Sequence, residues 1–212
     1  MKRRRVAVRG EIGEKVAMNL RPLDLANAHV RLVPLAPAQR EGLRGAGADP
    51  AIWRHWPRPA IGAAAFDAQF DWQLEEHAAG RWIIFAVERA GRLVGQTCYL
   101  NIRPEHRVVE VGGTWYAPDA QAGPVNPACK LLMLSHAFAQ GAERVELKTD
   151  AANARSRAAI LKLGATFEGV HRRHMVRPDG TYRDTAWFSV IRPEWQDVRA
   201  RLEARLAAFP GA

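Results

Sequence analysis

Cysteine is scarce in this chain. Cys98 and Cys129 are the only two among 212 residues, and each lies inside an apolar stretch. Neither belongs to a CxxC pair or to a cysteine–histidine cluster, which argues against a disulfide framework and against a structural zinc site. Both fit packed thiols in a reducing compartment, so we expect a cytoplasmic protein that holds no metal.

Long hydrophobic runs are also missing. No apolar stretch approaches the roughly 18 residues of a membrane-spanning helix. The basic start MKRRRVAVRG is not followed by the apolar segment of a secretory signal. We therefore expect no membrane partner, and the length of 212 residues suits one domain with extensions.

Acidic residues are few beside the basic ones, with 22 Asp and Glu against 31 Lys and Arg and a formal net charge of +9. Such a balance can point to nucleic acid, a membrane surface or an anionic ligand. Apart from Arg3 to Arg5 the arginines are scattered, and no basic motif with interleaved aromatic residues occurs. Solvated surface charge is the simpler interpretation, and a basic tail that binds nucleic acid stays an alternative.

Strand-type alternation and helical spacing follow each other along the chain from about residue 25, after a basic segment without a sustained period. Strands are expected at 29–35, 81–88, 92–102, 107–117, 144–150, 166–177 and 181–191. Helices are expected at 36–48, 63–80, 126–140, 153–164 and 193–209. Mostly antiparallel strands with inserted crossover helices predict a mixed α/β sheet.

The helix expected from Asn126 begins with a good cap and with Pro127 at its first position. Its apolar residues imply burial, so its unpaired N–H groups would offer a phosphate site after a strand. By itself this pattern is weak, because most such helix starts hold only water.

Asn153 and Ser156 begin an otherwise apolar stripe that continues through Ile160 and Leu163 on one helix face. A polar pair at that place suggests that something polar meets it. Alternatively, Asn153 caps the helix and Ser156 bonds the preceding turn.

Three stretches together resemble the GNAT superfamily of N-acetyltransferases, and more narrowly its RimJ/RimL-like branch. They are HVRLVPL, VEVGGTWYAPDAQAGPVNPACKLLMLSHAF and RVELKTDAANARSRAAILKLGATFEGVHRRHMVRPDGTYRDTAWFSVI. The resemblance implies an α/β (α+β) GNAT fold over residues 25–208, behind a basic extension over 1–24. It implies a mixed, mostly antiparallel twisted sheet of about six to seven strands, with helices on both faces and a splayed central strand pair.

The resemblance also implies how acetyl-CoA binds. Its pantetheine arm would pair with backbone near Thr114, Trp115 and Tyr116 and would contact Asn153. The family's phosphate loop, Q/R-x-x-G-x-G/A, would here be Gln121, Ala122, Gly123, Pro124, Val125 and Asn126.

This loop departs from the family pattern twice. Pro124 stands where glycine is usual and has no N–H to donate, and Asn126 stands where a tiny residue is usual. We therefore expect a changed set of donors, and weak or altered CoA binding is the alternative. Lys130 and Arg157 could lie near the phosphates or could be solvated helix charges.

Acetyl transfer to an amine needs a base for the amine and a proton for the leaving thiolate. The resemblance gives the second role to Ser156. Glu110 is the best-placed base, because valines around a strand interior withdraw its carboxylate from water. It could instead pair with an arginine or line a rim, and His174, Glu168 or ordered water are the other candidates.

Acceptor selectivity would come from Trp53, His55 and Trp56, which could wall the cleft or simply pack over the sheet edge. The spacing of His171 and His174 does not indicate a metal site, because it predicts that the two side chains lie on opposite faces of a strand. The acceptor stays open among a ribosomal protein N-terminus, a polyamine, an aminoglycoside and an amino acid.

The expected protein is thus a monomeric or homodimeric acetyl-CoA-dependent N-acetyltransferase. The alternative is a catalytically weak or inactive GNAT-fold protein that senses CoA. Residues 1–17 are expected to be dispensable, since Met18 offers another start.

Overall fold

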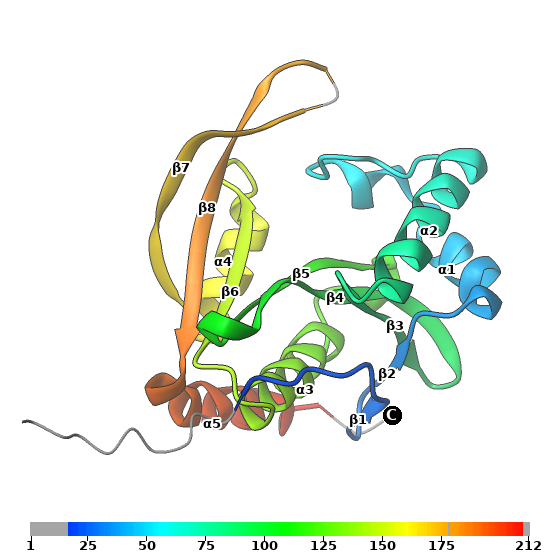
Figure 1. Ribbon diagram of the computed structural model, residues 1–212. Helices are drawn as coiled ribbons and strands as arrows, with labels where there is room; N and C mark the ends of the chain where they lie inside the picture. The colour runs from blue at the N-terminus through cyan, green and yellow to red at the C-terminus, as the bar shows by residue number, and fades with distance from the viewer. Residues whose placement is uncertain (1–16, 178, 210–212) are drawn as a thin grey trace, which may run out of the picture.

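One eight-stranded sheet forms the centre of the computed structural model, which describes residues 17–177 and 179–209 (Figure 1). The strand order is β1-β2-β3-β4-β5-β6-β8-β7, and only the β5–β6 pair is parallel. The strands are β1 (Leu25–Ala26), β2 (Arg31–Pro34), β3 (Ile83–Arg89), β4 (Arg92–Arg103), β5 (Val108–Tyr116), β6 (Arg144–Asp150), β7 (Thr166–Val176) and β8 (Tyr182–Ile191).

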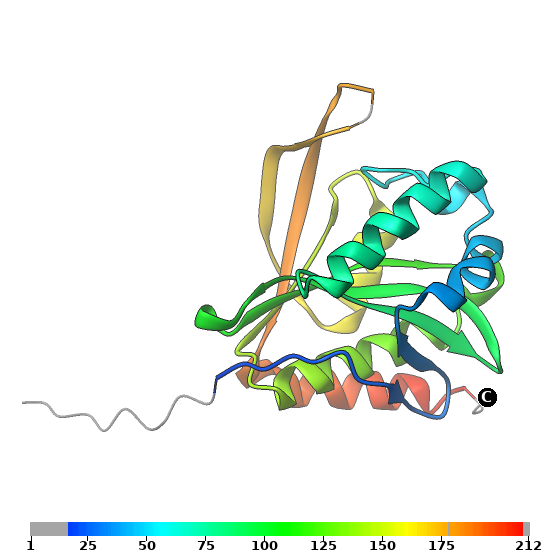
Figure 2. The same ribbon diagram turned by 45° about the vertical axis from the view of Figure 1, so that its right-hand side comes forward.

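Helices cover both faces of the sheet, as predicted (Figure 2). They are α1 (Arg40–Ala46), α2 (Ala63–Ala78), α3 (Val125–Ala139), α4 (Ala154–Leu163) and α5 (Trp195–Leu206). Helices α1 and α2 pack on one face over β3 and β4, while α3, α4 and α5 pack on the other. The crossover through α3 is what allows β5 and β6 to run parallel.

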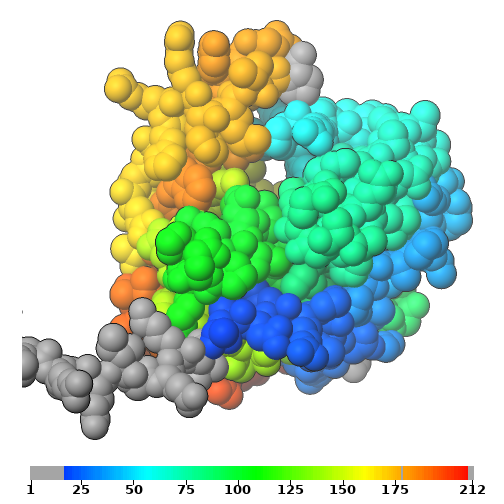
Figure 3. All heavy atoms as spheres, viewed as in Figure 1, coloured from blue at the N-terminus to red at the C-terminus, as the bar shows by residue number. Residues whose placement is uncertain are grey.

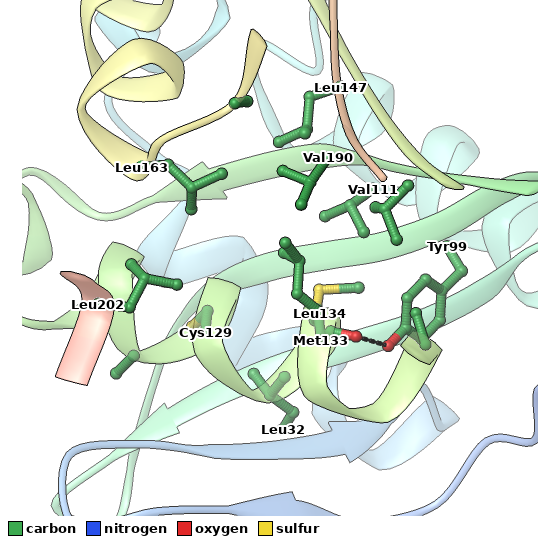
Figure 4. Close-up of a cluster of buried hydrophobic side chains, with 14 of the residues drawn as sticks. Leu32, Tyr99, Val111, Cys129, Met133, Leu134, Leu147, Leu163, Val190 and Leu202 are labelled. Carbon is green, nitrogen blue, oxygen red and sulfur yellow. Dashed lines mark hydrogen bonds between the residues drawn. The ribbon is translucent and has the colours of Figure 1, made fainter. Parts of the chain in front are cut away.

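Two hydrophobic cores result from this layering. The larger one lies between the sheet and α3 and α5, and Figure 4 shows Met133 and Leu134 of α3 in it. Inside it the Tyr99 hydroxyl donates to the Met133 carbonyl at 2.5 Å, so strand and helix are also joined by a buried hydrogen bond. The smaller core lies beneath α1 and α2 and contains Trp53 and Trp115.

The predicted elements are present, with one addition. Seven strands were expected at most, and the eighth is β1, whose two residues are too few to show a period. The predicted stripe of α5 is confirmed, because Trp195, Val198, Leu202 and Leu206 are all buried. Pro178, in the expected turn between β7 and β8, lies outside the described residues.

The predicted N-terminal extension is described only from Ala17, because residues 1–16 lie outside the described part. From there the chain runs along α3 (Figure 2). Met18 is buried in the larger core, Asn19 N donates to Gln140 O at 3.1 Å, and Asn27 Nδ2 donates to Ala128 O at 3.2 Å. The boundary at residue 25 stays a prediction, and any truncation has to keep Met18.

Within the described residues, none of the helices has the length and apolar character needed to span a bilayer.

Candidate functional site

Strands β5 and β6 separate in the middle of the sheet. They pair only from Val108 to Glu110 on β5 and from Arg144 to Glu146 on β6. Beyond Glu110, β5 pairs with β4 alone and β6 pairs with β8 alone. One edge of β5, including Thr114, Trp115 and Tyr116, therefore offers backbone groups without a strand partner. This is the splayed central pair that was predicted, and an extended ligand can bind to such an edge.

A β-bulge turns β5 at the start of this open edge. Between the pairs Cys98–Gly112 and Gln96–Trp115, β5 carries one residue more than β4. Gly113 has a positive φ of 54°, and a Cβ there would lie 2.7 Å from Cys98 Sγ, so the bulge requires glycine. As a result Thr114 faces α3 and Trp115 faces the smaller core.

Lys130 lies beneath the open edge rather than in solvent. Its side chain is buried, and Nζ donates to Thr114 Oγ1 at 2.8 Å. Thr114 Oγ1 in turn lies 2.8 Å from Thr97 Oγ1. Burial lowers the pKa of Lys130 to about 8, against a smaller opposite effect of the Cys129 and Cys98 thiols. Its contact with phosphates stays a prediction, and the alternative of a solvated helix charge is wrong.

The loop before α3 presents free backbone donors. Ala122 is left-handed with a φ of 62°, and Pro124 has helical angles of −73° and −17°. The N–H groups of Ala122, Gly123, Val125 and Asn126 make no hydrogen bond with the described residues. The first turn of α3 holds no acidic side chain. This helix start can therefore bind an anion.

The predicted cap at Asn126 is wrong. The first helical residue is Val125 instead of Pro127, two residues earlier, with Pro124 at the cap position and no capping side chain. The φ of proline suits a helix start, so Pro124 rather than Asn126 sets it. Asn126 Oδ1 instead accepts from the Tyr116 hydroxyl at 3.3 Å, which joins the open edge of β5 to the loop.

Gln121 connects the loop to both neighbouring elements. Its Nε2 donates to Tyr116 O at 2.8 Å, and its Oε1 accepts from Arg155 Nη2 at 2.7 Å. Arg155, which sequence reasoning passed over, thus brings an exposed positive charge from the first turn of α4 to the phosphate loop. Arg157 lies elsewhere: it donates to Ala151 O at 3.3 Å and stacks on Phe167.

The first turn of α4 carries the predicted polar pair. Asn153 caps the helix as predicted, because its Oδ1 accepts from Ser156 N at 3.0 Å. The Asn153 amide nitrogen and the Ser156 hydroxyl make no hydrogen bond to the described part of the chain. Both side chains are half-buried, so each keeps a polar group for a ligand.

Glu110 is 1% exposed and faces the same side of the sheet as α1 and α2. Its Oε2 lies 2.8 Å from Lys148 Nζ and accepts from Asn101 Nδ2 at 2.6 Å. Lys148 also lies over the ring of Trp187, 5.1 Å from its centre. The carboxylate is therefore held in an ion pair, with a lysine of β6 in place of the arginine considered above. Its role as a base stays a prediction.

The prediction that His171 and His174 point to opposite faces of the strand is wrong. Their ring centres lie 5.5 Å apart, and both rings lie against Trp187. Between His171 and Met175, β7 carries two residues more than β8, and Arg173 has a φ of 50°. This bulge reverses the alternation, so both histidines reach the face of Glu110.

The other two candidate bases differ in environment. Burial first, and then the positive charges of Lys148, His171 and Arg183, lower the pKa of His174. Its Nδ1 lies 3.1 Å from Thr185 Oγ1. Glu168 instead pairs with Arg144 and accepts from Ser189 at 2.8 Å, and the hydrogen bond from Arg144 lowers its pKa. Because the ion pair with Arg144 makes the Glu168 carboxylate a weaker proton acceptor, Glu168 suits the role of a base less well, and the role of both residues stays a prediction.

Of the three residues expected to wall the acceptor cleft, Trp53, His55 and Trp56, the first is instead part of the core. Trp53 is 2% exposed, donates from Nε1 to Gly47 O at 2.9 Å, and packs on Trp115 and Trp56. It supports the smaller core, which is the packing alternative. His55 and Trp56 are half-buried and stay predicted acceptor contacts.

Comparisons with known proteins agree with this geometry. A family model described as the acetyltransferase (GNAT) domain matches residues 29–166. None of the curated proteins matches the chain.

Solved structures match nearly the whole chain. A protein of T. thermophilus described as an acetyltransferase has 35% identity and a TM-score of 0.81, over 89% of this chain and 100% of its own. A GCN5-related N-acetyltransferase from Brucella melitensis has 26% identity and a TM-score of 0.85, over 92% and 90%. RimJ of Mycobacterium smegmatis, in complex with CoA-disulfide, has 22% identity and a TM-score of 0.71, over 86% and 94%. That last likeness shows the fold alone.

Proposed function

Because the chain belongs to the GNAT acetyltransferase family, we propose that it transfers an acetyl group from acetyl-CoA to a primary amine. The observation that carries this proposal is the separation of β5 from β6 beyond Glu110. The free N–H groups before α3 follow the far end of the open edge, and the Glu110 carboxylate stands at its near end. A thioester bound along this edge would reach from a phosphate site to a base.

The chain offers acetyl-CoA a set of donors that fits its groups. The pyrophosphate would accept from the N–H groups of Ala122, Gly123, Val125 and Asn126, with Arg155 nearby. The pantetheine arm would pair with the open edge of β5 and with the Asn153 amide nitrogen. Pro124 shapes this loop and does not donate.

Acetyl-CoA supplies an activated acetyl group, and the chain supplies proton transfer and position. Glu110 would take the proton of the amine as the amine attacks directly in a ternary complex. The Ser156 hydroxyl would return a proton to the leaving sulfur. Lys148 and Asn101 hold the Glu110 carboxylate in one orientation, which favours a defined attack geometry.

We further propose a RimJ/RimL-like enzyme of the cytoplasm, on the order of its motifs and on its two free, buried cysteines. A ribosomal protein N-terminus is one acceptor that this branch would imply. Neither the branch nor the compartment is needed for the chemistry above.

The test is an acetyl-CoA turnover assay over a panel of small amines and peptide N-termini. Release of free CoA is measured together with the mass of the acetylated amine. S-acetylpantetheine, which lacks the pyrophosphate, is the matched control donor. Its KM should be roughly 10-fold or more higher than that of acetyl-CoA, because a 10-fold change corresponds to the loss of about 1.4 kcal/mol of phosphate contacts. Equal use of both donors would contradict a phosphate site before α3.

A CoA-sensing protein without turnover is the second candidate, and Pro124 and Pro127 favour it because neither donates at the phosphate site. Calorimetric binding of acetyl-CoA without release of CoA from any amine in the panel would favour the sensor. Absence of binding would exclude both candidates.

Ser156→Ala is expected to lower kcat by roughly 10-fold, a modest effect for a general acid because a thiolate already leaves readily. The KM for acetyl-CoA should not change, and Ser156→Thr, which keeps a hydroxyl, should retain most of the activity. With an acetyl thioester of a more acidic thiol, the difference between wild type and Ser156→Ala should shrink. An equal loss with both thioesters would show that Ser156 does not protonate the leaving group.

A further inference from the structure

The face of the sheet that carries Glu110 is open over β6 and β8. Helices α1 and α2 cover this face over β3, β4 and the Trp115 end of β5. Figure 3 shows the molecule hollowed between the β7–β8 hairpin and the segment that leads into α2. Strand pairing places Lys148, Trp187, Thr185 and Arg183 on this face beside Glu110, and we call these five residues the open polar face.

Trp187 Nε1 is buried without a hydrogen-bond partner among the described residues, and so is one nitrogen of the charged residue Arg183. Arg183 is 6% exposed, and the nitrogen without a hydrogen bond is its Nε. The guanidinium makes neither a hydrogen bond nor an ion pair with any described residue. A buried charge without such partners is costly for a protein to keep, so its donors point to a ligand that the chain does not supply.

The nearest carboxylates are already used by other groups. Asp150 accepts from Arg177 Nη2 at 2.6 Å and from Ala152 N at 2.9 Å. Glu110 accepts from Lys148 and Asn101. Burial lowers the pKa of Arg183, and the charges of Asp150 and Glu110 only oppose that effect from a distance. Within the described residues Arg183 is therefore left without a paired anion.

Local charge indicates which anion fits. Around Arg183 stand two further cations, Arg177 and Lys148, and two carboxylates, Asp150 and Glu110. Three positive charges against two negative ones leave a single positive charge. A carboxylate, with one charge and two oxygens in a plane, matches both this charge and the planar fork of a guanidinium. A phosphate dianion would overcompensate the charge and face the two carboxylates.

We infer that Arg183 binds a carboxylate of the acceptor, so that the acceptor is an amino acid or another small amine that carries a carboxylic acid. This inference rests on the proposed function. Arg183 and Glu110 lie on the same face, so one small molecule can place its acid on Arg183 and its amine towards Glu110. Arg183 would act through position and specificity, because it binds the acceptor away from the reacting atoms.

The experiment compares matched acceptors at saturating acetyl-CoA. Each of the standard amino acids is paired with its amide, which keeps the amine and lacks the acid. A second set pairs amidated dipeptides that carry Asp or Asn at the second position. Because the amines of a pair differ in basicity, the quantity of interest is the ratio of kcat/KM between wild type and variant for each acceptor.

Arg183→Met should lower kcat/KM at least 10-fold for the acids and less than 2-fold for the amides. Arg183→Lys, which keeps the charge without the planar fork, should fall between. Arg172→Met, an exposed arginine of β7, makes the same charge change and should alter neither class. Loss confined to the Asp dipeptides would place the acid on a peptide side chain and overturn the small-molecule assignment.

Binding is measured separately from turnover by calorimetry with the CoA complex and the same pairs. Acids that bind through Arg183 without being acetylated would support a carboxylate site at Arg183 and contradict the proposed function, and with it the assignment of that acid as the acceptor. Equal losses for acids and amides in Arg183→Met would overturn the inference while leaving acetyl transfer in place. Failure of every acid both to bind and to react would overturn it as well.

Discussion

Glu110→Gln is expected to lower kcat by roughly 1,000-fold, within the range for loss of a positioned general base. Glutamine has the shape of glutamate and can still accept from Asn101, so the site should keep its form. What it loses is the carboxylate that we propose takes the proton of the amine. The KM for acetyl-CoA should change little, because Glu110 stands at the acceptor end of the open β5 edge.

Lys148→Met is the matched control. It removes the same 2.8 Å ion pair and leaves the carboxylate in place. If Glu110 is the base, Lys148→Met should cost far less in kcat than Glu110→Gln. If Glu110 only holds the two strands together through Lys148, both variants should lose activity and unfolding free energy to the same extent, and steady-state kinetics with urea unfolding would show it.

Lys130→Met is expected to raise the unfolding free energy by about 2 kcal/mol at pH 7. Folding lowers the pKa of Lys130 from 10.5 to about 8, a difference that corresponds to roughly 3 kcal/mol. The substitution also removes the hydrogen bond to Thr114, which lowers the expected stabilisation by about 1 kcal/mol. Methionine is of similar size and has no charge to bury.

The sign of the pH dependence follows from the two pKa values. Below pH 8 Lys130 is protonated in both states, so the full cost of burying its charge is present. Between pH 8 and pH 10.5 the folded protein loses the proton first, and the cost disappears as pH rises. The advantage of Lys130→Met should therefore be largest at pH 7 and small at pH 10.5.

Urea unfolding of both proteins at these two pH values measures this difference directly. Lys162→Met, at an exposed position of α4, is the control and should show no such dependence. A Lys130→Met protein that is less stable than wild type at pH 7 would mean that the buried ammonium is better compensated than its single contact with Thr114 indicates.

Sequence patterns predicted correctly those features that depend only on residues of the same helix or strand. The stripe of α5 and the Asn153 cap of α4 are examples, since spacing and cap chemistry determine them. The start of α3 was predicted two residues late. Asn-Pro is a common helix start, but the preceding Pro124 already takes helical angles that its residue type alone does not reveal.

The site was harder to predict because it depends on strand register. The partner of Glu110 was unknown until β5, β6 and β8 were aligned, so Lys148 went unnoticed. The face shared by His171 and His174 depends on a bulge that alternation cannot show. The position of Arg183 could have been predicted from the alternation along β8. Ala186, Phe188 and Val190 form the apolar side of this strand, and Arg183 belongs to the opposite, polar side.

The open margin of β5 has a second consequence, for solubility. Unpaired strand edges are the surfaces through which sheets of different molecules join and aggregate. This edge lies in the middle of the sheet, with β6 across the gap and α3 packed against β5 from below. The strand of another molecule would have to enter the gap between β5 and β6. An unbranched ligand chain is thinner than a strand with its side chains and needs less space there. The position of this edge inside the sheet therefore leaves the strand of another molecule little access to it.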